Sequence, residues 1–242
     1  MVRPADLPRP VADLHVHSVA SGHAYSTVLE LVRAARERGI SVLALTDHGP
    51  AMPGGPHLYH FGNLKAIPPR LEGVRVLRGV EANILDHRGS LDLPTAYLER
   101  LEWVLASLHP VSYAGGGPEE NTRALLAVLD NPHVHVLAHL GNPAFPCDLE
   151  QVVRRAAERG VAVELNNSSL TISRPGSRRN CQLVAAAAAR SGGPVSLGSD
   201  AHGAWSVGEL GQALELALAA GVRVEQILNL AEGRVEEFLR AR

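Results

Sequence analysis

The chain has 242 residues, of which 45% are hydrophobic and 20% are charged, and its formal net charge is −2. This composition is typical of a globular protein with a sizeable core. The near-zero charge argues against a long nucleic acid as partner, and no apolar stretch is long enough to span a membrane. The N-terminus has no apolar segment like those of signal peptides, and two cysteines cannot make a disulfide framework, so we expect a cytoplasmic protein.

Two residue counts are unusual for a chain of this size. The sequence contains one lysine, Lys65, and twelve histidines. A single lysine leaves one candidate for any mechanism that needs an active-site amine. Histidine is the commonest side-chain metal ligand and titrates near neutral pH, so the positions of the histidines are the most informative feature of this sequence.

Short β-branched or apolar runs alternate with amphipathic stretches along the chain. The apolar runs predict strands at Val11–His15, Ser41–Thr46, Val74–Val80, Trp103–Ser107, Val134–Ala138, Val161–Leu165 and Val195–Gly198. The amphipathic stretches predict helices at Thr27–Arg38, Thr95–Leu101, Glu119–Leu129, Leu149–Arg159, Asn180–Arg190, Val207–Ala219, Val224–Leu230 and Glu232–Leu239. Thr27 and Glu30 fit a capping box at the start of the first helix, and Gly39 and Gly160 follow the last turns of two helices.

Strand–helix alternation repeated seven times predicts an α/β fold with a parallel sheet and helices outside it. The count is one strand short of an eightfold barrel, so we expect an irregular or incomplete barrel, with an open doubly wound sheet as the alternative. No repeat, linker or low-complexity segment divides the sequence. Residues 1–242 are therefore expected to form a single domain, a size that α/β barrels commonly reach.

Six of the seven predicted strands finish with a histidine or a carboxylate. These residues are His15, His17, His48, Glu81, His109, His139, Asp200 and His202. Active sites of parallel α/β folds are built at this edge of the sheet. Residues two apart on a strand also share a face, so each of the two closely spaced pairs at the first and last strands can bind one ion.

Together with His23, this set offers nine nitrogen and oxygen ligands and no thiolate. Such ligands suit zinc, manganese or iron in a hydrolytic role. Nine ligands exceed what one ion can use. We therefore expect two or three ions that share a carboxylate, with Glu81 or Asp200 as the bridge.

Further polar residues are candidates for binding a substrate. Asn166 ends the sixth strand, and Arg174, Arg178 and Arg179 follow it, where forked guanidinium contacts could hold a phosphate. A solvated surface run is an equally good interpretation of these arginines. His60 lies in a loop rich in proline and glycine. This loop is equally well interpreted as the rim of an active site or as a plain loop. No nucleophile elbow, P-loop or dinucleotide motif is present in the sequence.

Four segments resemble the motifs of the PHP superfamily, named for polymerase and histidinol phosphatase. They are Asp13-Leu14-His15-x-His17-Ser18, Thr46-Asp47-His48, Gly79-x-Glu81 and Gly198-Ser199-Asp200-x-His202. Other stretches, including 77–83 and 164–169, are similar to the YcdX-like branch of probable phosphatases. The resemblance extends from about Ala12 to Leu239. It implies a distorted (βα)7 barrel with a metal site at the C-terminal ends of the strands.

The resemblance also implies a trinuclear centre, most often zinc in this branch. Carried over by position, the three ligand sets are His15, His17, Glu81 and Asp200; Glu81, His109 and His139; and His23, His48 and His202. Pro110 and Leu140 depart from the family pattern beside two ligands without removing either. The relatives further imply a homo-oligomer, with a trimer as the expected state.

These residues predict a metal-dependent phosphoesterase that hydrolyses a small phosphomonoester with a metal-activated water. We expect Asp200, Glu81 and His17 to carry the catalysis. Alternatives within the superfamily are a histidinol-phosphate phosphatase and a phosphodiesterase or nuclease that acts on short nucleic acid. An amidohydrolase-type enzyme would need a carboxylated lysine, and Lys65 lies away from the strand ends. The alternative of another class is a non-catalytic metal-binding or regulatory module.

Overall fold

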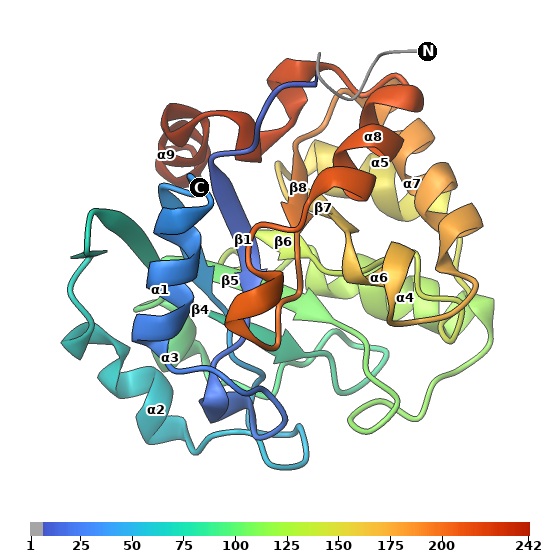
Figure 1. Ribbon diagram of the computed structural model, residues 1–242. Helices are drawn as coiled ribbons and strands as arrows, with labels where there is room; N and C mark the ends of the chain where they lie inside the picture. The colour runs from blue at the N-terminus through green and yellow to red at the C-terminus, as the bar shows by residue number, and fades with distance from the viewer. Residues whose placement is uncertain (1–6) are drawn as a thin grey trace.

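The computed structural model describes residues 7–242, and its strands form a sheet that curls into a nearly closed barrel (Figure 1). The parallel strands follow the order β1-β2-β4-β5-β6-β7-β8 around the sheet. They span Ala12–Val16, Val42–Leu45, Val74–Asn83, Trp103–Ser107, Val136–Leu137, Ala162–Asn166 and Val195–Gly198. A short β3, Arg70–Leu71, pairs antiparallel with the start of β4. The predicted barrel of seven parallel strands is confirmed.

The helices cover the outside of the sheet. They are α1 (Val28–Glu37), α2 (Leu58–Asn63), α3 (Thr95–Leu98), α4 (Pro118–Val128), α5 (Leu149–Glu158), α6 (Ser168–Thr171), α7 (Ser177–Ser191), α8 (Gly211–Ala219) and α9 (Glu232–Arg240). The capping box predicted for the first helix is confirmed. Glu30 N donates to Thr27 Oγ1 at 3.4 Å, and Thr27 N donates to the Glu30 carboxylate at 2.7 Å.

Three expectations about helices are wrong. The stretch Val224–Leu230 forms two 3-10 turns, η5 (Val224–Gln226) and η6 (Leu228–Leu230), with extended backbone at Ile227 between them. The helix expected from Val207 begins at Gly211, after the 3-10 turn η4 (Ala204–Ser206), because Gly208 has a positive φ of 77° that interrupts helical geometry. Residues 58–63, expected as loop, form α2.

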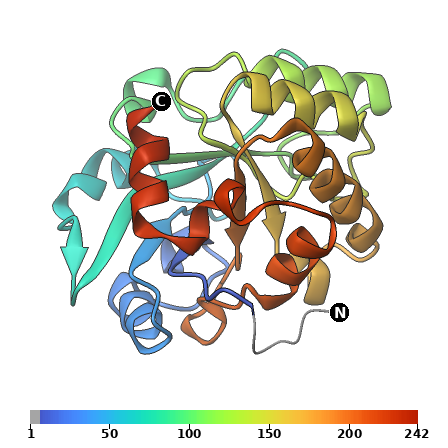
Figure 2. The ribbon, with the colours of Figure 1, turned by 90° about the horizontal axis from the view of Figure 1, so that it is seen from above.

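The seam between β1 and β8 is bridged by a side chain as well as by backbone. At the C-terminal end of the seam, Asp200 N donates to His15 O and His17 N donates to Ala201 O, each at 2.9 Å. At the opposite end, the buried Asn229 side chain donates to Ala12 O and Leu197 O, each at 2.8 Å, and accepts from Leu197 N at 2.7 Å. Seen from above, α9 lies across this N-terminal end of the barrel (Figure 2).

Alternate residues of the strands pack into two apolar clusters. On β2, Leu43 belongs to the larger cluster, which includes residues of the outer helices, whereas Ala44 belongs to the smaller one with Leu77 and with Val235 of α9. Because side chains alternate along a strand, Glu81 shares the face of Leu77 on β4. The apolar interior therefore gives way to a buried carboxylate toward the C-terminal ends of the strands.

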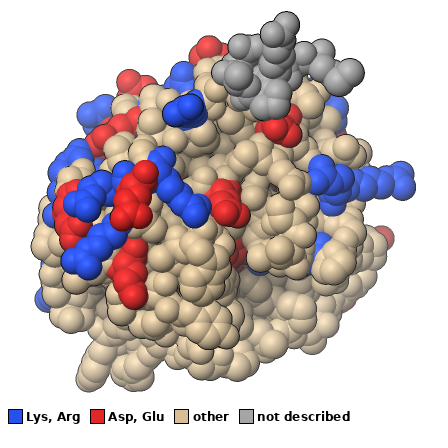
Figure 3. Space-filling model, viewed as in Figure 1, with Lys and Arg blue, Asp and Glu red and all other residues tan. Residues whose placement is uncertain are grey.

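The helices and the surface charge agree with the expectations from composition that the chain has no membrane-spanning segment and a near-zero net charge. Within residues 7–242, no helix combines the length and the apolar character needed to cross a bilayer. Basic and acidic side chains alternate over the side formed by α1 and α9 (Figure 3), where Arg33 and Arg36 each lie 3.0 Å from the Glu72 carboxylate. That side of the molecule thus carries mixed charge rather than an extended area of one sign.

Replacing Asn229 with alanine should destabilise the barrel by about 2–4 kcal/mol, because buried backbone groups of β1 and β8 lose their partners. Urea unfolding measures this free energy, and an unchanged denaturant slope would show that both chains unfold to the same extent. Asn63→Ala is the matched control, since Asn63 is exposed. If Asn229→Ala were as stable as this control, the side chain would not be what holds the seam together.

Candidate metal centre

The carboxylate of Glu81 lies at the centre of a histidine cluster at the C-terminal end of the barrel. It is fully buried and lies within 3.5 Å of nitrogen atoms from five histidines. The distances are 2.6 Å to His139 Nε2, 2.7 Å to His48 Nδ1, 3.3 Å to His109 Nε2, 3.4 Å to His15 Nε2 and 3.5 Å to His17 Nε2. Residues that are far apart in the sequence thus meet at the end of β4.

The remaining expected ligands extend this cluster toward the surface. Asp200 Oδ1 lies 3.2 Å from His17 Nε2, and the ring of His202 lies 4.3 Å from that of His17, centroid to centroid. His23 stacks 4.9 Å from both His48 and His202. The structure therefore brings all nine residues that the sequence singles out as ligands into one continuous group.

Three sets of side chains in this group each place their donor atoms within 4.8 Å of one another. The sets are His17, His48 and His202; His15, His17 and Glu81; and His48, Glu81 and His109. They overlap through shared residues, so the donors form one extended patch rather than three separate sites. Such a patch has room for more than one ion.

Several polar atoms in the cluster have no hydrogen-bond partner although they are buried. They are His48 Nδ1, Glu81 Oε2, His109 Nε2 and Asp200 Oδ1. Buried polar atoms normally find a partner, and an exception of this kind calls for an explanation. Donors of nitrogen and oxygen that converge on one another without satisfying one another fit a bound cation of the zinc class. The residues present therefore fit a metal centre.

Electrostatics favour the ionised form of both carboxylates in the cluster. Burial raises the pKa of Glu81, but the surrounding imidazoles, above all His109 and His48, outweigh it and hold this pKa well below its usual range. Burial opposes ionisation of Asp200 as well, and Arg174 is the main reason why the pKa of Asp200 is also well below normal. A metal ligand must be deprotonated, and these two groups are.

The imidazoles differ in their preferred protonation state. Burial lowers the pKa of His139 to about 4, with Arg174 adding to the effect, and burial together with His48 lowers the pKa of His17 well below normal. His15 is the exception, because Glu164 leads a group of carboxylates that overcome its burial and raise its pKa well above normal. A bound cation would therefore compete with a proton at His15.

Glu164 on β7 holds two members of the cluster in position through hydrogen bonds. Its Oε1 lies 2.7 Å from His15 Nδ1, and its Oε2 accepts a hydrogen bond from His139 N at 2.6 Å. A carboxylate can only accept, so His15 donates from Nδ1 to Glu164, and Nε2 is the ring nitrogen that faces Glu81. A Cβ at position 198 would lie 2.1 Å from Oε1 of Glu164, so Gly198 provides the space for this carboxylate.

Other members of the cluster have supporting contacts of the same kind. His17 Nδ1 lies 3.0 Å from Ser21 Oγ, which donates to Asp47 at 2.8 Å. His109 Nδ1 lies 2.8 Å from Asn83 Oδ1. The sequence reasoning did not assign these supporting roles. The alternation of side chains along a strand could have indicated that Glu164 points inward, because it lies two residues after buried Ala162 on the same face of β7.

Backbone strain is concentrated at the site. Among residues 7–242, four non-glycine residues have a positive φ, and three of them belong here: His139 at 31°, Arg174 at 49° and Asp200 at 56°. Such conformations cost about 1–3 kcal/mol each and persist when the surroundings hold them. For Asp200 that support includes the backbone hydrogen bond to His15 and the ion pair with Arg174.

The site opens through a cavity of about 480 Å³ lined by Arg174 and by members of the cluster. Arg174 Nη1 lies 2.9 Å from Asp200 Oδ2. Asn166 is buried and donates to Glu164 and Asp200 at 3.3 Å, which makes it a support rather than an open contact. His60 also lies behind the cluster, 3.2 Å from Asp47, and does not line the cavity.

The other two arginines expected near a phosphate lie outside this cavity. Arg178 donates to Gln212 at 2.6 Å, and Arg179 is exposed on α7. Neither lines the cavity that holds Arg174. The structure therefore places one of the three arginines at the cluster.

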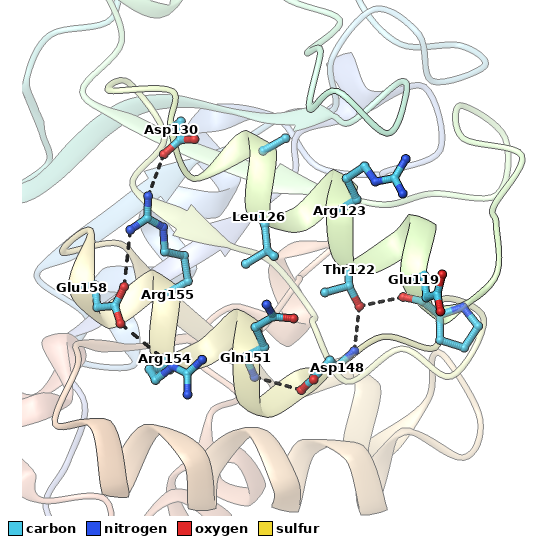
Figure 4. A pocket seen from close by; sticks show the side chains of 12 residues that line it. Glu119, Thr122, Arg123, Leu126, Asp130, Asp148, Gln151, Arg154, Arg155 and Glu158 are labelled. Carbon is cyan, nitrogen blue, oxygen red and sulfur yellow. Dashed lines mark hydrogen bonds and ion pairs between the residues drawn. The ribbon is translucent and has the colours of Figure 1, made fainter.

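A second hollow, of about 730 Å³, lies on the outside between α4 and α5 (Figure 4). Several of its charged side chains are paired with one another: Arg155 lies 3.2 Å from Asp130 and 3.4 Å from Glu158. No member of the histidine cluster lines it. The cavity at the strand ends is thus the candidate functional site.

Comparison with known proteins identifies the family. The PHP domain profile matches residues 13–145. The chain belongs to the PHP domain family. Its PHP relatives include a probable phosphatase of Syntrophotalea carbinolica, 50% identical over 230 residues that cover 94% of this chain and 95% of the relative. A probable phosphatase of Thermoanaerobacter sp. is 45% identical over 231 residues, covering 95% and 94%. The resemblance expected from the four motifs is therefore confirmed.

The PHP fold is also seen in a distant solved structure. Histidinol phosphate phosphatase of Lactococcus lactis, complexed with zinc, L-histidinol and phosphate, superposes with a TM-score of 0.60 at 18% identity. The match covers 88% of this chain and 95% of that one. At this level of identity the comparison supports the barrel fold and no more.

Replacing Glu164 with glutamine should lower zinc affinity by about 10–100-fold, because an amide no longer fixes the protonated Nδ1 of His15 as strongly. Competition with a chromophoric chelator measures the affinity. Glu158→Gln, on the exposed surface of α5, is the matched control. Equal zinc affinity in the two variants would show that Glu164 does not organise the centre.

Proposed function

We propose that this PHP chain is a metal-dependent phosphatase that hydrolyses a small phosphomonoester at a trinuclear centre. The carrying observation is the convergence of nine residues with nitrogen and oxygen donors, Glu81 among them, several of whose buried donor atoms lack hydrogen-bond partners. The probable phosphatases among its relatives support the reaction class. The donors come from strands and loops between β1 and β8 of one sheet, so we treat residues 1–242 as one hydrolase domain.

The family resemblance divides the nine donor residues among three cations. The proposed sets are His15, His17, Glu81 and Asp200; Glu81, His109 and His139; and His23, His48 and His202. Zinc is the proposed metal, and the same donor types also accept manganese or iron. Bound cations of this kind lower the pKa of a coordinated water and offset negative charge on phosphoryl oxygens.

Arg174 is placed to hold the phosphoryl group. Its hydrogen bonds to Ser169, Ser173 and Asp200 all use Nη1. The Nη2 edge of the guanidinium is therefore available to a phosphoryl oxygen, and Arg174 lines the same cavity as the donor cluster. Its buried ion pair with Asp200 fixes the direction in which this edge points.

Asp200 has one committed and one available oxygen. Oδ2 is held by Arg174 and Asn166, whereas Oδ1 has no hydrogen-bond partner and lies beside His17. We assign Oδ1 to binding a cation; a water activated by that cation would lie beside Asp200, which would then be placed to take its proton. Glu81 and His17 hold the centre together and, with Asp200, are the proposed catalytic residues. No protein nucleophile is needed for direct attack by water.

Histidinol phosphate is the second candidate substrate. The family resemblance is the reason to test it; the Lactococcus lactis enzyme, whose structure contains L-histidinol and phosphate, shares the fold alone. Both substrates are phosphomonoesters, so this candidate changes the leaving group and leaves the centre unchanged.

Zinc-loaded protein should release phosphate from at least one member of a panel containing sugar phosphates, nucleotides, histidinol phosphate and an aryl phosphate. Removing the metal with a chelator should abolish release. His17→Ala should lower kcat/KM by more than about 100-fold, since losing a ligand costs more than losing the support of a ligand. His87→Ala, exposed and outside the cluster, should retain activity. Undiminished turnover by His17→Ala would contradict the proposed centre.

Arg174→Ala should raise KM and weaken competitive inhibition by inorganic phosphate, each by about tenfold, because a charge-assisted contact to phosphate is lost. Steady-state kinetics with phosphate as inhibitor measure both quantities. Arg178→Ala is the matched control and should lie within about twofold of the native protein, in keeping with its place outside the cavity. A fall in kcat with no change in phosphate inhibition would mean that Arg174 acts through Asp200 alone.

A further inference from the structure

Two aromatic side chains stand exposed at the mouth of the cavity. Tyr25 is 72% exposed and Trp205 is 63% exposed, and both line the cavity that also contains His202 and Arg174. Large aromatic rings usually bury most of their surface, and exposed ones beside a site are typical of recognition. Neither residue has a role in the chemistry described above.

The loops that carry these two rings are held together by hydrogen bonds. Tyr25 N donates to His202 O at 2.8 Å, which joins the loop after β1 to the loop after β8. The carbonyl of Trp205 accepts a hydrogen bond from Arg38 Nη2 at 2.5 Å, at the end of α1. Figure 1 shows the two loops side by side, in blue and orange, at the front of the molecule. The rings are therefore exposed on a fixed backbone rather than on free loops.

The chain also provides space for the indole. A Cβ at position 203 would lie 2.4 Å from carbon atoms of the Trp205 ring. Gly203 has an extended backbone with φ of −169°, so the glycine leaves space for the indole in this position and is not needed for the backbone conformation. The indole thus lies against the main chain, with its ring 6.4 Å from that of Tyr25 and inclined to it by 27°.

The cavity has different chemistry at its two ends. The inner end contains the metal-binding cluster and Arg174, which suit a phosphate. The outer end contains the aromatic pair and, from the loop after α6, the side chain of Ile172, which is 84% exposed. Glu209 also lines the cavity, and its carboxylate pairs with Arg38 at 3.7 Å. A ligand that spans the cavity would be anionic at one end and flat and apolar at the other.

We propose that Tyr25 and Trp205 form a stacking platform for a flat ring carried by the organic part of the phosphomonoester. This inference rests on the proposed function and specifies the class of its substrate. Tyr25 follows His23 by two residues and Trp205 follows His202 by three, so the platform lies next to the centre. Two exposed and nearly parallel rings offer a π face on which any planar ring can stack, whatever hydrogen-bonding groups that ring carries.

The test compares two substrates that differ only in the ring. Adenosine 5′-monophosphate and ribose 5-phosphate share the phosphate and the sugar, and only the first carries a base. In Trp205→Ala and Tyr25→Ala, kcat/KM for the nucleotide should fall by roughly tenfold, mainly through KM, while ribose 5-phosphate changes by less than about twofold. Trp205→Phe should restore most of the loss. Tyr59→Ala, which removes an aromatic ring 77% exposed but outside the cavity, should change neither substrate.

Phenyl phosphate and histidinol phosphate extend the comparison to rings held at other distances from phosphorus. The substrate whose kcat/KM falls most in Trp205→Ala identifies the spacing that the platform fits. If the native protein hydrolyses the nucleotide and ribose 5-phosphate equally well, or if Trp205→Ala lowers both to the same extent, the platform is refuted.

A binding measurement separates failure of the platform from failure of the proposed function. Trp103 is fully buried, so ring stacking should quench the fluorescence of Trp205 selectively. Quenching by adenosine 5′-monophosphate and not by ribose 5-phosphate, in a protein that releases no phosphate, would support the platform and refute the phosphatase. Equal or absent quenching by both ligands in an active enzyme would refute the platform and leave the phosphatase standing.

Discussion

Burying the Glu81 carboxylate is the constraint on which the rest of the site depends. An ionised group without solvent is stable only when it is paired, and breaking such pairing costs several kcal/mol. Here the nearest groups are five imidazoles. They can compensate the negative charge of Glu81 if they are protonated, or they can bind, together with Glu81, a cation that compensates it. Burial opposes protonation of His17 and His139. A cation satisfies the carboxylate and the imidazoles together, and it accounts for the donor atoms that find no partner within the protein.

The barrel makes this arrangement possible by treating its two ends differently. At the N-terminal end, Asn229 and α9 close the structure, and the side chains there are apolar. At the C-terminal end, the donors lie near the ends of the strands or in the loops that follow them. Strained backbone at His139 and Asp200 turns these side chains inward, and Glu164 and Arg174 hold them there. Stability is thus built at one end of the barrel and function at the other.

The sequence predicted the sheet well, and it predicted which residues meet at the C-terminal edge of the sheet, because both depend on regular spacing. Strand periodicity and order determine which residues reach the C-terminal edge, and His15 and His17 share a face for that reason. The supporting residues were harder to predict. Glu164 has the parity of an inward residue, but its contact with His15 depends on Gly198 leaving room on the neighbouring strand.

The periodicity of the sequence could not predict in which direction the side chains of the loops point. Arg174, Arg178 and Arg179 lie close together in the sequence, yet the left-handed backbone of Arg174 turns its side chain into the cavity while the other two follow α7 outside it. Similarly, the apolar stretch Val224–Leu230 has a helical pattern, but the need for Asn229 to reach both β1 and β8 breaks it into two turns. In both places tertiary contacts override local preference.

The central claim is that the buried donors around Glu81 are assembled to hold cations. Anomalous diffraction at the zinc edge, from crystals of zinc-loaded protein, tests this most directly. We predict peaks within coordination distance of Glu81, with His15, His17 and Asp200 around one peak and His109 and His139 around another. Density that shows these side chains hydrogen-bonded to one another, with no peak among them in a protein saturated with zinc, would contradict the account.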